Sequence, residues 1–214
     1  MPPKEKRSRT LIKVCGVRSP EEALAILDLG ADAVGVVVAE GSPRQVDFDA
    51  ASLIAEAAGP RCVLVDRSPR DHDRLRLVRD WIGPVQVHGV MPDLPRRWIR
   101  AVTGTIPTAP ADSDISAWLL DAPEAGSGRP WAWTRPAWLG DRPMVLAGGL
   151  KPDTVASAIA ATLPWAVDVS SGVEIDRGRK DLGLVRAFVA SVRAADAAAG
   201  RTEAPTPIDF PAIA

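Results

Sequence analysis

Short apolar runs alternate with segments of helical periodicity along almost the whole chain, and this alternation constrains the fold more than any other feature. Eight runs have the length and composition of β-strands. In chain order they are residues 11–15, 33–38, 62–65, 85–87, 102–106, 118–120, 144–146 and 167–169. Continuous apolar runs are typical of parallel strands that are buried on both faces. A strand-then-helix rhythm of this kind predicts a parallel sheet.

Local signals place the helices between these strands. Ser19 can cap a helix that Pro20 opens, Glu22 can complete the capping box, and Gly30 is a natural stop. Residues 107–114 are expected to form a loop, so the strand–helix unit near the fifth strand is reduced. The remaining helices are expected at residues 48–58, 71–81, 94–100, 134–139, 152–162 and 182–198.

Eight such units predict one closed (β/α)₈ barrel, or TIM barrel, over residues 11–199, and a chain of 214 residues suits one domain. An open doubly wound sheet is the structural alternative. That fold normally has a glycine fingerprint after its first strand, which Cys15-Gly16-Val17-Arg18 does not provide. Residues 1–10 are expected to be a basic N-terminal extension, and residues 200–214 a proline-containing C-terminal tail.

Composition argues against several classes of protein. The chain has 27 acidic and 26 basic residues, so no basic excess indicates a nucleic-acid or membrane surface. No apolar run approaches the roughly 20 residues of a membrane helix, and no signal-peptide core follows the basic start. Two cysteines and two histidines are too few for a disulfide framework or a zinc site. We therefore expect a cytoplasmic protein.

Two glycine-rich segments follow the seventh and eighth predicted strands. The first contains Gly148 and Gly149, and the second contains Ser170, Ser171 and Gly172. In a (β/α)₈ barrel the loops at these positions frequently bind phosphate. Glycines let backbone N–H groups converge on phosphate oxygens, and serine hydroxyls add donors. Plain turns are the alternative, but the position of both segments favours a phosphate site.

Side chains that can move protons follow other strands. Cys15 ends the first strand and can serve as a base or nucleophile if its pKa is lowered, whereas a buried structural cysteine is the alternative. Cys62 begins its strand, which is the wrong end for chemistry. Asp121 ends the sixth strand and can act as a general acid if burial raises its pKa, with a helix cap or solvated aspartate as the alternative. Asp168 can support the barrel mouth by hydrogen bonding.

Three further polar residues are expected near the mouth. Arg44 lies on the loop after the second strand and is suited to a bidentate grip on a carboxylate, although a surface arginine is the alternative. Gln86 and His88 flank Val87 at the end of the fourth strand. His88 can be a base, but a packed, hydrogen-bonded histidine is the favoured interpretation.

Taken in order, these segments resemble the phosphoribosylanthranilate isomerase family, which are (β/α)₈ enzymes of tryptophan biosynthesis. The resemblance covers roughly residues 11–190. It is carried by Lys13-Val14-Cys15-Gly16, Gly30-Ala31-Asp32-Ala33-Val34-Gly35, Ser42-Pro43-Arg44, Val85-Gln86-Val87-His88-Gly89, Leu119-Leu120-Asp121, Leu146-Ala147-Gly148-Gly149-Leu150, Val167-Asp168-Val169-Ser170-Ser171-Gly172-Val173-Glu174 and Lys180-Asp181.

The resemblance implies an Amadori rearrangement of N-(5-phosphoribosyl)anthranilate to a 1-deoxyribulose 5-phosphate product, without metal or cofactor. It implies that Asp121 protonates the ribose ring oxygen, that Cys15 removes the C2′ proton and that Arg44 holds the anthranilate carboxylate. The phosphate is then expected on Gly148, Gly149, Ser170, Ser171 and Gly172. Further residues expected to line the substrate are Gln86, His88, Gly126, Ser127, Gly128 and Asp168. The expected partner is a small phosphorylated substrate, with a monomer or a homodimer as the assembly.

Departures from the family pattern lie on the side that would face the anthranilate. Gly126-Ser127-Gly128-Arg129 stands where the family usually has Gly-Gly-Thr-Gly-Lys, and Val90-Met91-Pro92 follows His88-Gly89 in place of acidic residues. Two alternatives therefore stand beside the isomerase. One is a related Amadori isomerase that acts on a modified aryl or amino ribonucleotide, and the other is a non-catalytic relative that binds a phosphosugar.

Overall fold

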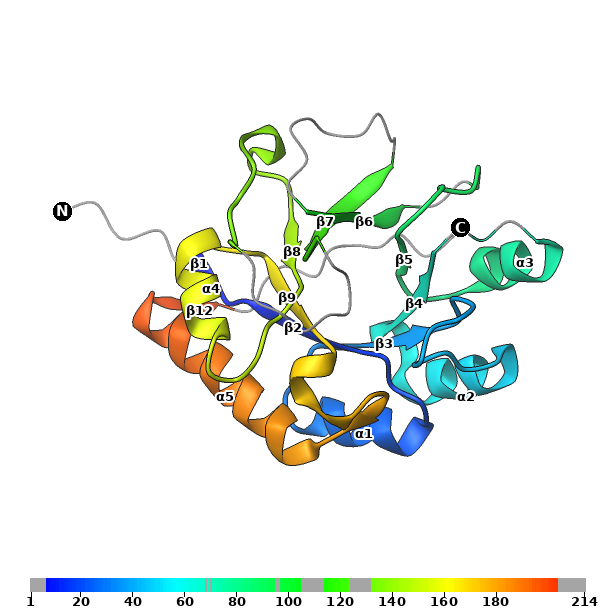
Figure 1. Ribbon diagram of the computed structural model, residues 1–214, viewed down its shortest axis with the longest axis horizontal. Helices are drawn as coiled ribbons and strands as arrows, with labels where there is room; N and C mark the ends of the chain where they lie inside the picture. The colour runs from blue at the N-terminus through cyan, green and yellow to red at the C-terminus, as the bar shows by residue number, and fades with distance from the viewer. Residues whose placement is uncertain are drawn as a thin grey trace.

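Eight parallel strands close into a barrel in the computed structural model of the chain (Figure 1), which describes residues 7–67, 69, 71–94, 97–104, 114–123 and 132–203. The strands neighbour one another in chain order, and β9 pairs with β2 from Leu11↔Ala166 to Val14↔Val169, which closes the ring. Their bounds are β2 Leu11–Cys15, β3 Ala33–Val37, β4 Cys62–Asp66, β5 Val85–Val87, β6 Trp98–Thr103, β7 Ile115–Asp121, β8 Met144–Leu146 and β9 Ala166–Val169. The predicted closed barrel is confirmed.

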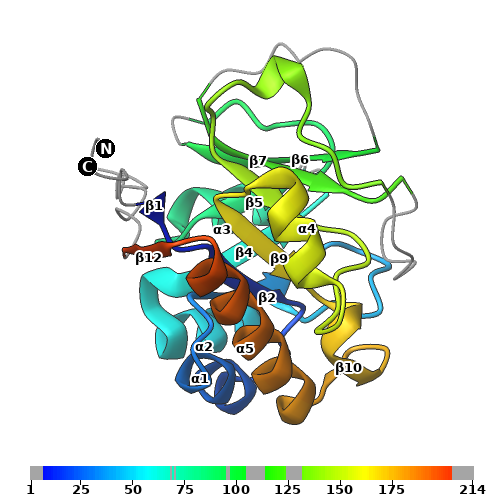
Figure 2. The ribbon, with the colours of Figure 1, turned by 90° about the vertical axis from the view of Figure 1, so that its left-hand side faces the viewer.

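Helices pack around the outside of this barrel, and Figure 2 shows α5 between α1 and α4. Ser19 caps α1 as predicted, since its hydroxyl accepts a hydrogen bond from the Glu22 N–H at 3.2 Å, whereas the Glu22 carboxylate accepts from the Arg18 N–H at 2.8 Å. The helices are α1 Pro20–Asp28, α2 Phe48–Ala58, α3 His72–Asp80, α4 Val155–Thr162 and α5 Leu182–Ala198, with short 3₁₀ turns η1 Gly59–Arg61, η2 Ala137–Leu139 and η3 Ser171–Val173. No helix in the described ranges is both long and apolar enough to cross a membrane.

The prediction of a helix at residues 94–100 is wrong, because residues 98–100 begin strand β6. The fifth strand of the barrel therefore begins at Trp98, four residues before its expected start at residue 102. Trp98 and Ile99 are both buried, and β6 pairs with β7 along its whole length to Thr103↔Asp121. Burial of both faces together with this long ladder outweighs the local helix signal.

The helix expected at residues 134–139 is also wrong, because only the three-residue turn η2 forms there. Pro136 precedes this turn and Gly140, with φ of 55°, ends it. Three residues between a proline and a left-handed glycine leave no room for an α-helix. The loop expected at residues 107–114 falls almost wholly outside the described residues.

Strand alternation divides the apolar residues into two layers. Side chains such as Val14 and Val167 point outward into a large core between the strands and the helices. The inward positions form a separate cluster that includes Cys15, Leu119 and Ala166. Polar residues occur at the same inward register, since Lys13 lies two residues before Cys15 and Asp168 two residues after Ala166. The inside of the barrel therefore carries charge towards its mouth.

The two ends of the described chain meet beneath the barrel. Strand β1, Arg7–Ser8, pairs in parallel with β12, Arg201–Glu203, and this small sheet links residues of the expected extension and tail. Nearby, the buried Asp196 of α5 accepts hydrogen bonds from the Thr10 N–H at 2.8 Å and the Thr10 hydroxyl at 2.7 Å. This contact fastens the last helix to the residue that precedes the first barrel strand.

Replacing Asp196 should therefore weaken closure of the barrel. Asp196→Ala leaves the buried Thr10 N–H and hydroxyl without their acceptors, which should lower the free energy of unfolding by about 3 kcal/mol. The exposed Asp28, at the end of α1, provides the control, and Asp28→Ala should change stability by less than about 0.5 kcal/mol. Urea unfolding of both variants measures this difference, and equal stabilities would contradict the role given to Asp196.

Candidate active site

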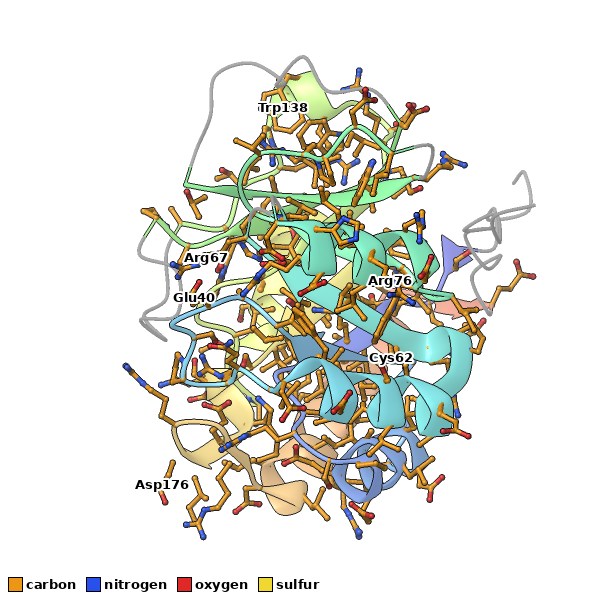
Figure 3. The ribbon with its side chains drawn as sticks, turned by 90° about the vertical axis from the view of Figure 1, so that its right-hand side faces the viewer. Glu40, Cys62, Arg67, Arg76, Trp138 and Asp176 are labelled. Carbon is orange, nitrogen blue, oxygen red and sulfur yellow. The ribbon has the colours of Figure 1, made fainter. Side chains whose placement is uncertain are left out.

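A cavity of about 730 Å³ opens at the carboxyl ends of the barrel strands, a size usual for a small-molecule site. Most of the residues expected to form a site from the sequence line it, namely Cys15, Arg44, Gln86, His88, Asp121, Gly148, Gly149, Asp168, Ser170 and Ser171. Gly172 does not line the cavity but follows Ser171 within η3. Gly126, Ser127 and Gly128 lie outside the described residues. Cys62 lies towards the opposite end of β4 from the mouth residue Arg67 (Figure 3), as expected of a cysteine that begins its strand.

The two glycine-rich segments pack against other backbone so closely that larger residues do not fit. Gly148 has φ of 79°, and a Cβ there would lie 2.3 Å from the Ala122 backbone nitrogen. A Cβ on Gly172 would lie 1.9 Å from the Leu150 carbonyl oxygen. The glycines therefore allow main chain from neighbouring loops to come together along this wall of the cavity.

A buried ion pair lies beside Cys15. The Lys13 ammonium donates a hydrogen bond to an Asp168 carboxylate oxygen at 2.9 Å, and both side chains are buried. A Cβ on Gly35 would lie 2.9 Å from the Cys15 sulfur and 3.0 Å from the Lys13 nitrogen, so thiol and ammonium both face the space that Gly35 leaves open. Burial raises the pKa of the Cys15 thiol, and the positive charge of Lys13 acts in the opposite direction.

Asp121 meets the condition set for a general acid. Burial, with a smaller contribution from the negative charge of Asp168, raises its pKa to about 6. The Ala122 N–H donates to one Asp121 oxygen at 2.8 Å, which acts against this rise. Asp121 therefore holds a proton to a much higher pH than an exposed aspartate does.

Arg44 lies at the cavity wall and forms a bidentate ion pair with Glu174, which follows the last barrel strand. Its Nε donates to Oε1 of Glu174 and its Nη2 donates to Oε2, each at 2.7 Å. The side chain passes directly over Gly16, where a Cβ would lie 2.5 Å from Arg44 Cδ. Arg44 is thus held in one arrangement and is not a loose surface arginine.

Glu174 and Lys180 are functional candidates that were not predicted from the sequence, although both lie within the motifs that carry the family resemblance. Lys180 donates to Oε1 of Glu174 at 2.7 Å and to the hydroxyl of Ser170 at 3.2 Å. Burial acts to raise the pKa of Glu174, but hydrogen bonds from Arg44 and Lys180 bring it down to about 2. The signal that could have found these residues is a charged pair six positions apart in a segment that follows the last strand.

Lys13 is the third missed residue. A lysine in an apolar strand, two positions before Cys15 and therefore on the same face, is a signal that alternation alone could have detected. Such a lysine has to lie inside the barrel, where it needs a carboxylate partner.

His88 is packed within the wall of the cavity. Its Nε2 lies 2.8 Å from Nε2 of Gln86, and burial together with the nearby charges of Lys13, Arg67 and Arg100 lowers its pKa to about 4. His88 is therefore neutral at neutral pH. In the part of the chain that the structure describes, no group of three His, Cys, Asp or Glu side chains is placed to hold a metal ion.

Comparison with known proteins agrees on one family. The family model described as N-(5'phosphoribosyl)anthranilate (PRA) isomerase matches residues 12–191. An N-(5'-phosphoribosyl)anthranilate isomerase of Geobacter sp. (strain M21) is 38% identical over 200 residues, which are 86% of this chain and 98% of the relative.

Solved structures give the same result. A phosphoribosyl anthranilate isomerase from Thermus thermophilus superposes with a TM-score of 0.75 at 35% identity, covering 86% of this chain and 99% of the other. A second isomerase was solved in complex with reduced 1-(o-carboxyphenylamino)-1-deoxyribulose 5-phosphate; its TM-score is 0.67 at 27% identity, with 86% and 99% covered.

The charges of the buried Lys13–Asp168 pair should shift the pKa of Asp121 in opposite directions. Asp168→Asn removes a negative charge that raises the Asp121 pKa, so that pKa should fall below about 6. Lys13→Met removes a positive charge that lowers it, so the pKa should rise above about 6. Carbon-13 NMR titration of labelled aspartate measures both shifts. Shifts of the same sign, or no shift in either variant, would contradict this electrostatic coupling.

Proposed function

The chain belongs to the N-(5′-phosphoribosyl)anthranilate isomerase family, and from this premise we propose that Cys15 and Asp121 carry out the isomerisation that the family's name describes. The protein is an isomerase of tryptophan biosynthesis. The observation that best supports the proposal is the cavity itself, which has a thiol and a carboxyl of raised pKa on its walls, between glycine-rich loops and a fixed arginine.

Asp121 is the general acid in this proposal. It gives its proton to the ribose ring oxygen of N-(5′-phosphoribosyl)anthranilate, and the C1′–O bond breaks to leave a protonated imine. The raised pKa supports this role because a general acid works best when its pKa lies near the working pH. An exposed aspartate would already have lost this proton.

Cys15 is the general base. As a thiolate it takes the proton from C2′, and the electron pair of that C–H bond moves towards the imine to form an enolamine. The enolamine then becomes the 1-deoxyribulose ketone. At the end Cys15 is a thiol and Asp121 a carboxylate, so Cys15 releases one proton to solvent and Asp121 takes one up before the next turnover. Lys13, which faces the same space as the thiol, supports formation of the thiolate.

The remaining residues hold the two charged ends of the substrate. Arg44 holds the anthranilate carboxylate, and the segments of Gly148, Gly149, Ser170, Ser171 and Gly172 hold the 5′-phosphate. Fixing both ends orients C2′ towards Cys15 and the ring oxygen towards Asp121, and such orientation supplies much of the rate of a proton-transfer enzyme.

We further propose that the enzyme is cytoplasmic and acts as a monomer or a homodimer. Sedimentation analysis distinguishes these two assemblies.

Substitution of the two proton-transfer groups tests the proposal. Asp121→Asn and Cys15→Ala should each lower kcat by roughly 10²–10⁴-fold, the usual contribution of a positioned acid or base. Arg44→Met should mainly raise KM. Loss of phosphoribosylanthranilate fluorescence measures turnover. Cys62→Ala is the matched cysteine control and should keep kcat within about twofold, because Cys62 lies outside the cavity lining. Full activity in Cys15→Ala and Asp121→Asn would remove both residues from the mechanism.

The pH profile gives an independent test. The reaction needs a protonated Asp121 and a deprotonated Cys15, yet the Asp121 pKa of about 6 lies below the raised thiol pKa. Between the two pKa values, the fraction of enzyme in the required protonation state is small and constant. Below the lower pKa and above the higher one, this fraction decreases. We expect kcat/KM to rise as pH increases through about 6, to stay level through neutrality, and to fall only in the alkaline range. A steady fall of kcat/KM through pH 6 would mean that the base has the lower pKa.

A further inference from the structure

The hairpin that follows the last barrel strand braces the loop of Arg44. Strands β10, Glu174–Asp176, and β11, Arg179–Lys180, pair in antiparallel fashion. At one end of the hairpin Glu174 takes two hydrogen bonds from Arg44. At its turn, Gly178 has φ of 84°, and a Cβ there would lie 3.0 Å from the Pro43 carbonyl oxygen. Two separate contacts therefore fix this hairpin against the same loop.

The charges at this contact do not balance. Arg44 and Lys180 place two cations around the single carboxylate of Glu174, and the three side chains are only 12%, 0% and 4% exposed, respectively. The buried Lys13–Asp168 pair inside the barrel is neutral by itself. The Arg44–Glu174–Lys180 cluster thus carries one excess positive charge at the cavity wall. An uncompensated buried charge is costly, and an anion from the ligand would relieve it.

The guanidinium of Arg44 is only half used. A guanidinium has five N–H groups and two edges that can each take a carboxylate. Glu174 occupies the edge made by Nε and Nη2. Among the described residues, none accepts a hydrogen bond from Nη1. The edge made by Nη1 and the second N–H of Nη2 is therefore available to a second carboxylate.

Lys180 connects this clamp to the phosphate-binding side. Besides Glu174, its ammonium contacts the Ser170 hydroxyl at 3.2 Å and the Ser170 carbonyl oxygen at 3.3 Å. The Ser170 hydroxyl in turn donates to the Cys15 carbonyl oxygen at 2.9 Å. One chain of polar contacts thus runs from Arg44 through the hairpin to the serine loop and to the end of β2.

We propose that Glu174 and Lys180 are positioning residues that set the specificity of the site for a ligand carrying both an aromatic carboxylate and a phosphate. Glu174 holds one edge of Arg44 so that the other edge faces the ligand carboxylate. Lys180 fixes Glu174 and Ser170 together, so both clamps keep one separation. The inference rests on the role of Arg44 in the proposed function and adds the residues that make Arg44 selective.

A matched pair of ligands isolates the carboxylate. One ligand is reduced 1-(o-carboxyphenylamino)-1-deoxyribulose 5-phosphate, and the other is the same molecule without the ring carboxylate. Calorimetric Kd values should favour the carboxylated ligand by roughly tenfold or more in the wild-type protein. In Glu174→Gln this advantage should fall below about threefold, while the Kd of the ligand without the carboxylate stays within about twofold. KM for the substrate should rise about tenfold, with kcat within about threefold.

Controls come from the same hairpin. Asp176 and Arg179 form an exposed ion pair, so Asp176→Asn and Arg179→Met should leave both Kd values within about twofold. Lys180→Met should weaken both ligands by roughly fivefold or more, because it releases Glu174 and Ser170 together. If Glu174→Gln does not fold, Lys180→Met is compared with Arg179→Met for the same two ligands and for turnover. Weaker binding of both ligands with kcat within about threefold supports the inference, and unchanged Kd values or a large loss of kcat would overturn it.

Three results would overturn the inference. If Glu174→Gln keeps the wild-type advantage of the carboxylated ligand, Glu174 does not orient Arg44. If the substitution increases that advantage, Glu174 competes with the ligand for Arg44. If it weakens binding of both ligands equally, the role of Glu174 is structural. Absence of any carboxylate advantage in the wild-type protein would instead overturn the role of Arg44 in the proposed function.

Discussion

The buried ion pair between Lys13 and Asp168 is the interaction on which the rest of the site depends. It lies inside the barrel, at 2.9 Å, where an isolated lysine or aspartate would be very costly. Lys13 faces the same space as the Cys15 thiol, and the charges of both partners act on the pKa of Asp121. One neutral pair thus influences both groups that are proposed to move protons, which belong to strands on different parts of the ring.

Two groups of charged side chains lie at the barrel mouth: this ion pair inside the barrel and a cluster at the cavity wall. The Lys13–Asp168 pair is neutral, whereas the Arg44–Glu174–Lys180 cluster has an excess of one positive charge. This excess charge supports the proposal that Arg44 binds the carboxylate of the substrate. On the other side of the cavity, Gly148 and Gly172 allow neighbouring loops to pack closely, because a side chain at either position would strike neighbouring backbone. The fold thus shapes the site in two ways. Glycines let loops pack closely, and strand alternation points a few polar side chains into the barrel.

Much of this could be predicted from sequence because local signals and strand alternation carry it. The strand at residues 11–15, the helix at residues 48–58 and the cavity positions of Cys15 and Asp121 follow from periodicity and from the rule that barrel sites lie at strand ends. The start of β6 could not be predicted, since pairing with β7 decides it and that partner lies more than ten residues away. The bidentate contact of Arg44 with Glu174 could not be predicted either, because the two residues are 130 positions apart in the sequence. Their meeting depends on closure of the ring, which no local pattern records.

Lys13 favours the thiolate form of Cys15 against the effect of burial, and the pH dependence of Cys15 alkylation tests this most directly. A chain with Cys62→Ala isolates the signal, and iodoacetamide modification of Cys15 is followed with and without Lys13→Met. We expect an apparent thiol pKa above the usual range in the parent, because burial dominates, and a still higher pKa after Lys13 is replaced. The same alkylation profile in both proteins, or a lower pKa in the Lys13 variant, would contradict it.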